Sequence, residues 1–377
     1  MRFPEFSGEW NKYTINDLAT VVGGGTPDTT VKSYWGGDIQ WFTPSEIGKN
    51  KYVDFSKRTI TRDGLDNSSA KLLPLHTILL SSRATVGECS IASNECTTNQ
   101  GFQSLIAKQC NIDFLYYLIQ TKKKDLIRNA CGSTFLEISA NEIRKIKVAV
   151  PVQNEQEQIA KLLSLIDERI ATQNKIIEDL KKLKSAIVDK LYSSAKGETY
   201  SFRQLFEVVN EKNKKLIYSN VLSASQELGM IERSDINIDI KFEQNSISEY
   251  KIVRKGDYVV HLRSFQGGFA FSDRTGICSP AYTILHPNDL VAYGYLSHFF
   301  ISKPFIKSLK LVTYGIRDGR SINVDEWLDM TVTLPTKREQ SHILAIINAI
   351  DNKLHNENQI HNYMFRQRTY LLKTMFI

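Results

Sequence analysis

The chain has 377 residues, of which 42% are hydrophobic and 24% charged, which predicts a globular protein of about two domains. Its net charge of +7 permits a polyanionic partner without requiring one. No window approaches the roughly 18 apolar residues of a membrane span, and the amino-terminal MRFPEFSGEW has no apolar leader, so we expect a cytoplasmic protein.

The cysteines form no CxxC pair and no Cys/His spacing typical of a metal site. An odd number of cysteines also argues against a disulfide framework. We therefore expect reduced, buried thiols and no metal at the following positions: Cys89, Cys96, Cys110, Cys131 and Cys278.

Residues 1–150 predict a mixed body with glycine-punctuated loops. These loops are GGGTPDTT from Gly23, SSRATVG from Ser81, NQGF from Asn99 and CGSTF from Cys131. Arginine, amide and hydroxyl side chains read base edges and bind phosphates, and glycine permits close backbone approach. The same residue types also populate ordinary surface loops, so composition alone leaves both interpretations open. Trp35 and Trp41 are more typical of a core than of a stacking platform.

Residues 151–196 predict a long helix. The β-branched run IKVAV ends at Pro151, and Asn154 with Glu157 suggests a capping box. Apolar residues then recur at alternating steps of three and four, the spacing of a coiled-coil seam. This seam consists of Ile159, Leu163, Ile166, Ile170, Ile177, Leu180, Ile187 and Leu191.

Residues 197–334 predict a second mixed body, with the loops LRSFQGG from Leu262, SPAY from Ser279 and TYGIRDGRS from Thr313. Asp239 and Lys241 form a D-x-K pattern that, with Asp235, resembles half of a nuclease metal site, but such triplets are frequent. P-loop, GxGxxG, HExxH and G-x-S-x-G motifs are absent from the whole sequence. We therefore expect no catalytic site.

Residues 335–377 predict a second long helix that repeats the first. Residues 146–192 align with 330–376 without a gap, which places Glu155 on Glu339 and Gln156 on Gln340. Thr336 and Glu339 suggest a capping box. The second seam consists of Ile343, Ile347, Ile350, Leu354, Met364, Leu371 and Met375.

Polar residues interrupt both seams at equivalent positions, Gln173 with Glu357 and Lys184 with Arg368. They favour either register-fixing polar contacts or a solvated interruption. A further alignment, in a slightly different register, places Arg83 on Arg263 and NQGF on SPAY. The sequence is thus a duplicated module, with fold class α/β (mixed α+β). We expect two globular bodies related by a pseudo-twofold axis and joined by two long antiparallel coiled-coil helices.

The motifs resemble those of one known family. GGGTP, WGGDIQWFTPSEI, LLSSRATVG, TTNQGF and the two P-x-x-x-EQ-x-x-I helices are similar to those of specificity subunits of Type I restriction-modification systems, in the same order. The resemblance implies a non-catalytic subunit with two target recognition domains, which reads a bipartite asymmetric sequence in double-stranded DNA. It also implies two methyltransferase subunits and restriction subunits as partners. S-adenosylmethionine, ATP and Mg would lie on those partners, with no cofactor on this chain.

Particular side chains follow from the loops and the repeat. As DNA contacts we select Ser82, Arg83, Thr85, Gln100, Arg263, Ser264, Gln266, Arg317 and Arg320. Glu155, Gln156, Glu339 and Gln340 are interpreted either as part of a subunit-docking surface or as helix-start residues that serve capping and dipole interactions.

Two other classes remain open at this point. A DNA-independent coiled-coil scaffold or adaptor would show no salt-dependent binding to duplex DNA. A solitary nuclease or methyltransferase would show turnover by the purified chain. The sequence recognised cannot be read from loop side chains, because single residues in variable loops carry no transferable code.

Overall fold

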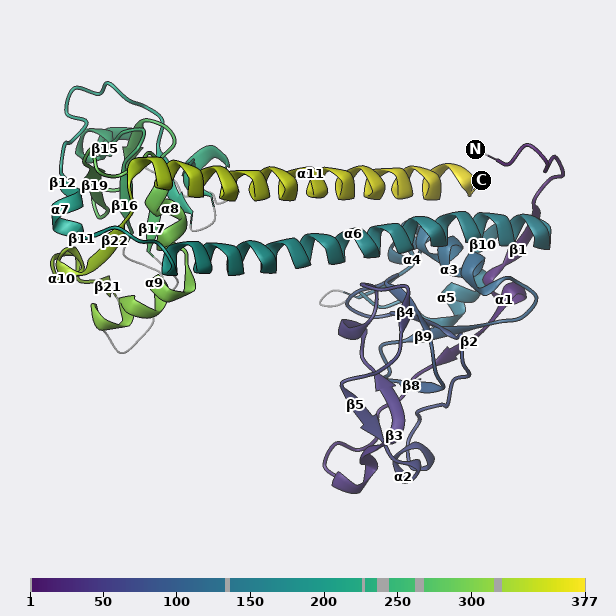
Figure 1. Ribbon diagram of the computed structural model, residues 1–377. Helices are drawn as coiled ribbons and strands as arrows, with labels where there is room; N and C mark the ends of the chain where they lie inside the picture. The colour runs from purple at the N-terminus through teal and green to yellow at the C-terminus, as the bar shows by residue number, and fades with distance from the viewer. Residues whose placement is uncertain are drawn as a thin grey trace. The chain divides into compact units, whose positions relative to one another are not determined.

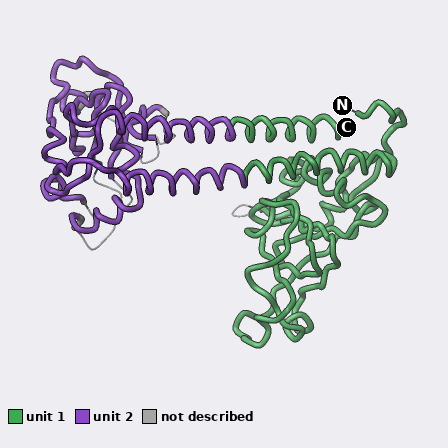
Figure 2. Tube along the Cα trace, viewed as in Figure 1, with its two compact units in different colours: residues 1–174, 359–377 green, residues 175–358 purple. Residues whose placement is uncertain are grey.

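A computed structural model describes residues 2–132, 136–225, 228–235, 244–261, 268–314 and 321–376. The chain divides into two compact units, residues 1–174 with 359–377 (unit 1) and residues 175–358 (unit 2), shown in Figure 2. These bounds differ from the four predicted segments because each long helix contributes one end to each unit. Among the helices described, none is both long enough and apolar enough to cross a membrane.

The larger sheet of unit 1 has the strand order β2-β9-β6-β7-β4. Its strands are β2 (Ala19–Gly23), β9 (Gln103–Ala107), β6 (Ile78–Leu80), β7 (Cys89–Ala92) and β4 (Tyr52–Val53). All neighbours are antiparallel except β4, which runs parallel to β7. Because successive side chains alternate between the faces of a strand, Ile78 and Leu80 join the core beneath α3 (Ile112–Thr121), while Leu79 packs with Phe42 on the other face.

A smaller sheet of unit 1 has the order β5-β3-β8. In it β3 (Trp35–Phe42) pairs antiparallel with β5 (Arg58–Ile60) and parallel with β8 (Cys96–Thr98), with a register shift between Trp35 and Ile39. In Figure 1, β3 and β5 lie at the end of unit 1 away from α6.

The remaining elements of unit 1 frame these sheets. β1 (Asn11–Thr14) pairs antiparallel with β10 (Lys147–Val150). The short helices are α1 (Ile15–Leu18), α2 (Arg62–Asp66), α4 (Lys123–Arg128) and α5 (Ala140–Lys145), with 3₁₀ turns at Lys32–Tyr34 and Pro44–Glu46.

Unit 2 contains a four-stranded sheet in the order β12-β19-β16-β17. Its strands are β12 (Phe206–Val209), β19 (Thr283–Pro287), β16 (Tyr258–Val260) and β17 (Phe269–Phe271). The other pairs are β11 (Glu198–Ser201) with β22 (Thr331–Leu334), β13 (Leu222–Ser225) with β14 (Gly229–Glu232), β15 (Lys251–Val253) with β18 (Gly276–Cys278), and β20 (Thr313–Tyr314) with β21 (Ser321–Ile322). The helices are α7 (Phe202–Leu205), α8 (Tyr295–Phe300), α9 (Lys303–Ser308) and α10 (Val324–Asp329), with 3₁₀ turns at Arg233–Asp235, Gln244–Glu249 and Leu309–Leu311.

The strand orders confirm the duplicated module. The order β2-β9-β6-β7 in unit 1 corresponds to β12-β19-β16-β17 in unit 2. The predicted alignment of Arg83 with Arg263 carries β6 onto β16 position by position. It also carries the hydrogen bond from Ser81 N–H to the Glu88 carbonyl onto that from His261 N–H to the Gly268 carbonyl, both 2.8 Å. One local sequence pattern has therefore produced the same sheet twice.

The two long helices are α6 (Gln153–Ser193) and α11 (Lys337–Met375). In unit 1 the amino-terminal part of α6 shares a core with the carboxy-terminal end of α11, through Ile159, Leu163 and Leu371. In unit 2 the roles are exchanged, and Val188 of α6 shares a core with Ile347 of α11. Within each unit the two helix segments therefore pack with opposite ends together, as an antiparallel coiled coil requires, and every predicted seam residue is buried or half-buried.

The structure shows which predicted capping boxes form and whether the polar seam residues are buried or solvated. Thr336 and Glu339 form the predicted capping box, in which Thr336 N–H donates to Glu339 Oε2 at 3.0 Å. The box predicted for Asn154 and Glu157 is wrong, because α6 already begins at Gln153. Gln173 and Glu357 are each only 6% exposed, so these seam interruptions are buried rather than solvated.

Candidate nucleic-acid interface

In unit 1 the conspicuous sequence motifs converge on one locus. The Gly25 N–H donates to the Thr98 carbonyl at 2.8 Å, and the Thr26 hydroxyl donates to Gln100 Oε1, so the GGGTP loop lies against the NQGF loop. The SSRATVG loop also contacts the NQGF loop, because the Ser82 N–H donates to the Gly101 carbonyl at 2.8 Å. Segments that are far apart in the chain thus form one continuous loop surface.

Close backbone approach explains the glycines of this locus. A Cβ on Gly24 would lie 2.0 Å from the Asn99 carbonyl oxygen, and one on Gly25 would lie 2.3 Å from the Ala70 nitrogen. Since no side chain fits at such distances, only glycine allows the GGGTP loop to reach NQGF. Ala84, within SSRATVG, has φ of 63°, an uncommon left-handed conformation for a residue other than glycine.

The predicted DNA contacts of unit 1 are only partly accessible. Arg83, Thr85 and Gln100 are exposed, and Arg83 Nε lies 3.8 Å from Glu137 Oε2, a loose ion pair. Ser82 is fully buried and its hydroxyl has no hydrogen-bond partner. Hydrogen bonds of its backbone to Gly101 and Ile138 turn the Ser82 side chain inward, and its assignment as a DNA contact stays a prediction.

The two tryptophans support the same locus. Trp41 is 4% exposed and its indole N–H donates to the Gly25 carbonyl at 2.9 Å, which confirms its core assignment. Trp35 is half-buried, meets Trp41 edge to face, and donates from its indole N–H to the Asp28 carbonyl at 3.1 Å. The guanidinium of Arg58 lies over the Trp35 ring, 3.6 Å from its centroid. Arg58 was not among the predicted contacts, and its local sequence carries no signal that distinguishes it from other exposed arginines.

The predicted contacts of the second body lie outside the described residues. They are Arg263, Ser264, Gln266, Arg317 and Arg320. Asp239 and Lys241 of the D-x-K pattern also lie outside them. The strand that precedes Arg263, β16, and the one after it, β17, match their unit 1 counterparts. These assignments stay predictions.

The helix-start residues are mostly internal. Glu155 is fully buried and accepts two hydrogen bonds from the Arg2 guanidinium, at 2.7 and 2.6 Å, and one from the Trp10 indole at 3.3 Å. Its repeat partner Glu339 is exposed and caps α11 through Thr336. The difference has a local cause. Val152 immediately precedes α6 at the position that Thr336 occupies before α11, and valine has no hydroxyl with which to form a capping box. The replacement of threonine by valine in the aligned sequences could have indicated that Glu155 binds other residues instead of capping its own helix.

Gln156 and Gln340 perform the same task in the two units. Gln156 Oε1 accepts from Asn111 N–H at 3.0 Å while its amide donates to the Pro151 carbonyl at 2.9 Å. Gln340 Oε1 accepts from Ala292 N–H at 2.7 Å while its amide donates to the Pro335 carbonyl at 2.8 Å. Each glutamine fastens the start of a long helix to its globular body. Glu155, Gln156 and Gln340 are thus buried at the helix starts, which supports their helix-start interpretation, while the docking interpretation stays a prediction.

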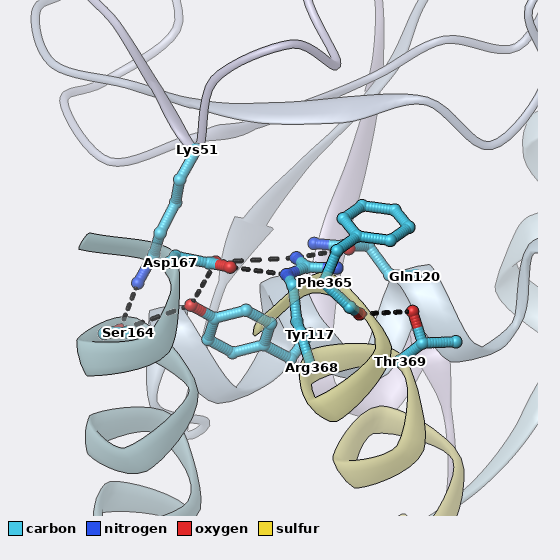
Figure 3. Close-up of polar contacts among 8 residues, drawn as sticks. All are labelled: Lys51, Tyr117, Gln120, Ser164, Asp167, Phe365, Arg368 and Thr369. Atoms are coloured by element: carbon cyan, nitrogen blue, oxygen red, sulfur yellow. Dashed lines mark hydrogen bonds and ion pairs between the residues drawn. The ribbon is translucent and has the colours of Figure 1, made fainter. Parts of the chain in front are cut away.

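A polar cluster joins α6, α11 and α3 in unit 1 (Figure 3). Asp167 pairs with the Arg368 guanidinium and accepts from the Tyr117 hydroxyl at 2.7 Å, and Arg368 also donates to Gln120 at 3.0 Å. Lys51 donates to Ser164 at 2.6 Å at the edge of the cluster. Burial and the Asp167 charge raise the pKa of Tyr117 far above its usual range, so the hydroxyl stays protonated as a donor.

The repeat places a related but simpler pair in unit 2. The alignment of the two helices puts Asp167 on Asp351 and Lys184 on Arg368, and Lys184 does pair with Asp351. These contacts support the register-fixing interpretation of Lys184 and Arg368. His298, on α8, lies near this pair, and burial followed by the Lys184 charge lowers its pKa.

Metal-ligand and thiol chemistry find little support in the described part of the chain. No group of three His, Cys, Asp or Glu side chains there is placed to hold a metal ion. Burial raises the pKa of Cys89, Cys96, Cys110 and Cys278 to about 12, so these thiols are poor nucleophiles. Cys131 is exposed, which corrects the prediction that all five thiols are buried.

Known proteins are similar in sequence to parts of this chain. The Methanocaldococcus jannaschii Type I restriction enzyme MjaIX specificity subunit is 39% identical to this chain over 183 residues, which cover 46% of this chain and 42% of that protein. The Escherichia coli Type I restriction enzyme EcoR124I/EcoR124II specificity subunit is 28% identical over 216 residues, which cover 53% and 52%. The chain spans about half the length of the curated relatives it matches.

Solved structures show the same fold along almost the whole chain. A Type I restriction-modification S subunit from M. genitalium matches with a TM-score of 0.54 and 16% identity, covering 100% of this chain and 99% of that one. A chain from a structure of the type I R-M system matches with a TM-score of 0.64 and 12% identity, covering 98% of each. The family described as the Type I restriction modification DNA specificity domain matches residues 7–182 and again residues 197–363. Because the two matches together cover most of this chain, the chain belongs to the Type I restriction modification DNA specificity domain family.

Proposed function

We propose that the chain is a DNA-reading specificity subunit that recognises a bipartite, asymmetric target in double-stranded DNA. The observation that carries the proposal is the specificity domain present twice, on the same sheet order but with unlike loops. Unit 1 has the GGGTP loop and the strands β3 and β5, whereas unit 2 has NEKNKK from Asn210 at the corresponding place. Two unlike readers on one repeated frame recognise two unlike half-sites.

The loop surface of unit 1 has the chemistry that reading requires. It presents the guanidinium of Arg83, the amide of Gln100 and the hydroxyl of Thr85 at one locus, on a chain of net charge +7. Such side chains form hydrogen bonds to base edges and phosphates, and a positive balance favours binding to a polyanion.

The partners follow from the same proposal. Two methyltransferase subunits and, in a full complex, restriction subunits carry the chemistry, with S-adenosylmethionine, ATP and Mg bound on them. The relatives named above are specificity subunits of Type I restriction enzymes, which supports this division of labour. The chain itself makes no covalent bonds with DNA and acts in the cytoplasm.

The test is methylation mapping. The chain is co-expressed with the methyltransferase encoded beside it, and methylated positions are mapped across a genome by single-molecule sequencing. We expect one split motif methylated on both strands. Replacing residues 1–150 by the corresponding domain of another specificity subunit should change one half of the motif and leave the other half unchanged.

The outcomes separate the alternatives. A stable complex that methylates no defined motif, with no salt-dependent binding of the chain to duplex DNA, would favour a DNA-independent scaffold. Turnover by the purified chain alone, with metal or S-adenosylmethionine added, would instead indicate a solitary nuclease or methyltransferase. An exchange that changes both half-motifs would contradict one half-site per domain.

A further inference from the structure

The guanidinium of Arg58 is held in a fixed position at the end of unit 1 away from α6. Its carbon lies 3.6 Å from the Trp35 ring centroid and 5.5 Å from that of Trp41. The two indoles meet edge to face, with centroids 5.0 Å apart and planes at 90°. Each indole N–H donates to a backbone carbonyl, Trp35 to Asp28 and Trp41 to Gly25. The platform under Arg58 is therefore anchored on both sides.

The backbone of Arg58 is anchored as well. Arg58 pairs across the sheet with Trp41, and the Ser56 hydroxyl donates to the Arg58 carbonyl at 2.6 Å. The same hydroxyl accepts from Trp41 N–H at 2.9 Å. Strand pairing and the Ser56 hydroxyl thus hold the backbones of Arg58 and Trp41 in one register.

The donors of Arg58 remain available. Stacking uses the flat face of a guanidinium and leaves its N–H edge open. Arg58 is exposed, and no carboxylate among the described residues forms an ion pair with it. By contrast, Arg62 pairs with Asp66 and Arg128 with Asp125 in the same unit. An exposed arginine that lies over an indole and has no carboxylate partner among the described residues suits an acceptor pair that comes from outside the chain.

The platform connects Arg58 to the candidate nucleic-acid interface. Trp41 holds the Gly25 carbonyl, and the next residue, Thr26, donates to Gln100. The stacked guanidinium and the exposed amide of Gln100 are therefore linked through one side chain and one loop.

We propose that Arg58 reads a guanine in the half-site recognised by unit 1, by donating its N–H fork to the O6 and N7 acceptors. Bidentate contact with guanine is the commonest specific use of arginine on DNA. An arginine side chain that is already oriented before DNA binds suits recognition of a base, because little rotamer freedom is lost on binding and the N–H fork approaches the base from one direction. This inference rests on the proposed DNA-reading function, and it adds Arg58 with its Trp35 platform to that function.

The test uses the chain in complex with its methyltransferase. Arg58→Lys keeps the positive charge and most of the aliphatic stem but removes the N–H fork. Arg58→Ala removes the charge and the fork together. Arg128→Ala is the matched control, because Arg128 is an exposed arginine of the same unit with its own carboxylate partner. For each variant the methylated motif is mapped, the affinity for a target duplex is measured against salt concentration, and the thermal unfolding midpoint is recorded.

We expect the wild type to methylate a motif with a guanine in the unit 1 half. Arg58→Lys should make that position degenerate, with a loss of discrimination of about 10-fold or more, while the other half-motif and the salt dependence stay unchanged. Arg128→Ala should leave the motif intact. The unfolding midpoint of Arg58→Lys should match the wild type, which excludes loss of folding as the cause.

Other outcomes overturn the inference. An unchanged motif with Arg58→Lys, or a unit 1 half-motif without guanine, would exclude base reading by Arg58. A uniform loss of affinity with Arg58→Ala, with the salt dependence reduced by about one phosphate contact, would assign Arg58 to the DNA backbone instead. If the wild type itself methylates no motif, the proposed function fails, and that result is distinct from a wild-type motif that Arg58 variants leave unchanged.

Discussion

Asp167 and Asp351 occupy equivalent positions of the repeat but have unequal surroundings. The Asp167 side chain is 19% exposed and its Arg368 partner 17%, and Tyr117 adds a hydrogen bond. The Asp351 side chain is 38% exposed, and Lys184 is 22% exposed. Solvent screens the second pair more strongly, so the two carboxylates should differ in their contribution to stability.

We predict that Asp167→Asn lowers the free energy of unfolding by about 2 kcal/mol, because Arg368 loses its carboxylate in a mostly buried cluster. Asp351→Asn, the matched variant in unit 2, should cost about 1 kcal/mol or less. Urea unfolding followed by circular dichroism compares the two. Equal losses would contradict the importance of burial and of the Tyr117 hydrogen bond.

At the scale of elements, the starts of α6 and α11 show how one substitution redirects a repeated residue. Thr336 allows Glu339 to close a capping box, whereas Val152 leaves Glu155 to Arg2 and Trp10. The amino-terminal residues of the chain are thereby held against the start of α6. A single hydroxyl thus decides whether the repeated glutamate serves its own helix or binds a distant segment.

Thr336→Val should remove the box and destabilise the protein by about 1 kcal/mol at neutral pH, whereas Thr336→Ser should retain most of the stability. Hydrogen bonds from the Thr336 side chain and then its backbone lower the pKa of Glu339 below its ordinary value of 4.5. A lowered folded-state pKa contributes stability above the unfolded value, and this contribution is lost as the pH falls through the folded value. The difference between wild type and Thr336→Val should therefore narrow below pH 4.5 in thermal unfolding. If the stability difference between wild type and Thr336→Val stays constant across acid pH, the Glu339 carboxylate does not contribute to it.

The reciprocal substitution, Val152→Thr, should stabilise α6 by less than Thr336→Val destabilises α11. A threonine hydroxyl can accept from the Glu155 N–H, but the Glu155 carboxylate remains bound by Arg2. Combining Val152→Thr with Arg2→Ala leaves the Glu155 carboxylate only the longer Trp10 hydrogen bond, so Val152→Thr should stabilise the protein more in that background. The same unfolding assay tests this, and an equal effect of Val152→Thr in both backgrounds would exclude competition for Glu155.

At the scale of the whole molecule, unit 1 takes residues from both ends of the sequence, whereas unit 2 is one continuous segment, residues 175–358. Leu371 and Met375 of α11 complete the core that residues 15–166 begin. We predict that Leu371→Ala, which opens a cavity at a residue 8% exposed, costs about 2–5 kcal/mol. The exposed neighbour Tyr370 is the control, and Tyr370→Ala should be nearly neutral.

Hydrogen exchange localises the effect of Leu371→Ala. Protection should fall in α3 and the amino-terminal part of α6, which share the core with Leu371, and β16 and β19 of unit 2 should retain theirs. Loss of protection in unit 2 to the same extent would contradict two separately stabilised cores.

Residue patterns alone predicted the duplication, the two long helices with their seams, the mixed α/β bodies and the resemblance to Type I specificity subunits. These features are local or periodic: the seams follow from apolar residues at alternating steps of three and four, capping from nearby residues, and the repeat from comparing the chain with itself. Thr336 with Glu339 is an example in which partners close together in the sequence could be identified in advance.

The contacts of the helix-start and loop residues could not be predicted from the sequence, because they join segments that are far apart in the chain. Glu155 meets Arg2 from the far end of unit 1's sequence, Gln156 meets the start of α3, and Ser82 turns inward. The stacking of Arg58 on Trp35 depends on a register shift in β3 that brings the two side chains together. Such long-range pairings depend on how strands and loops close in space, and the pattern of neighbouring residues does not encode them.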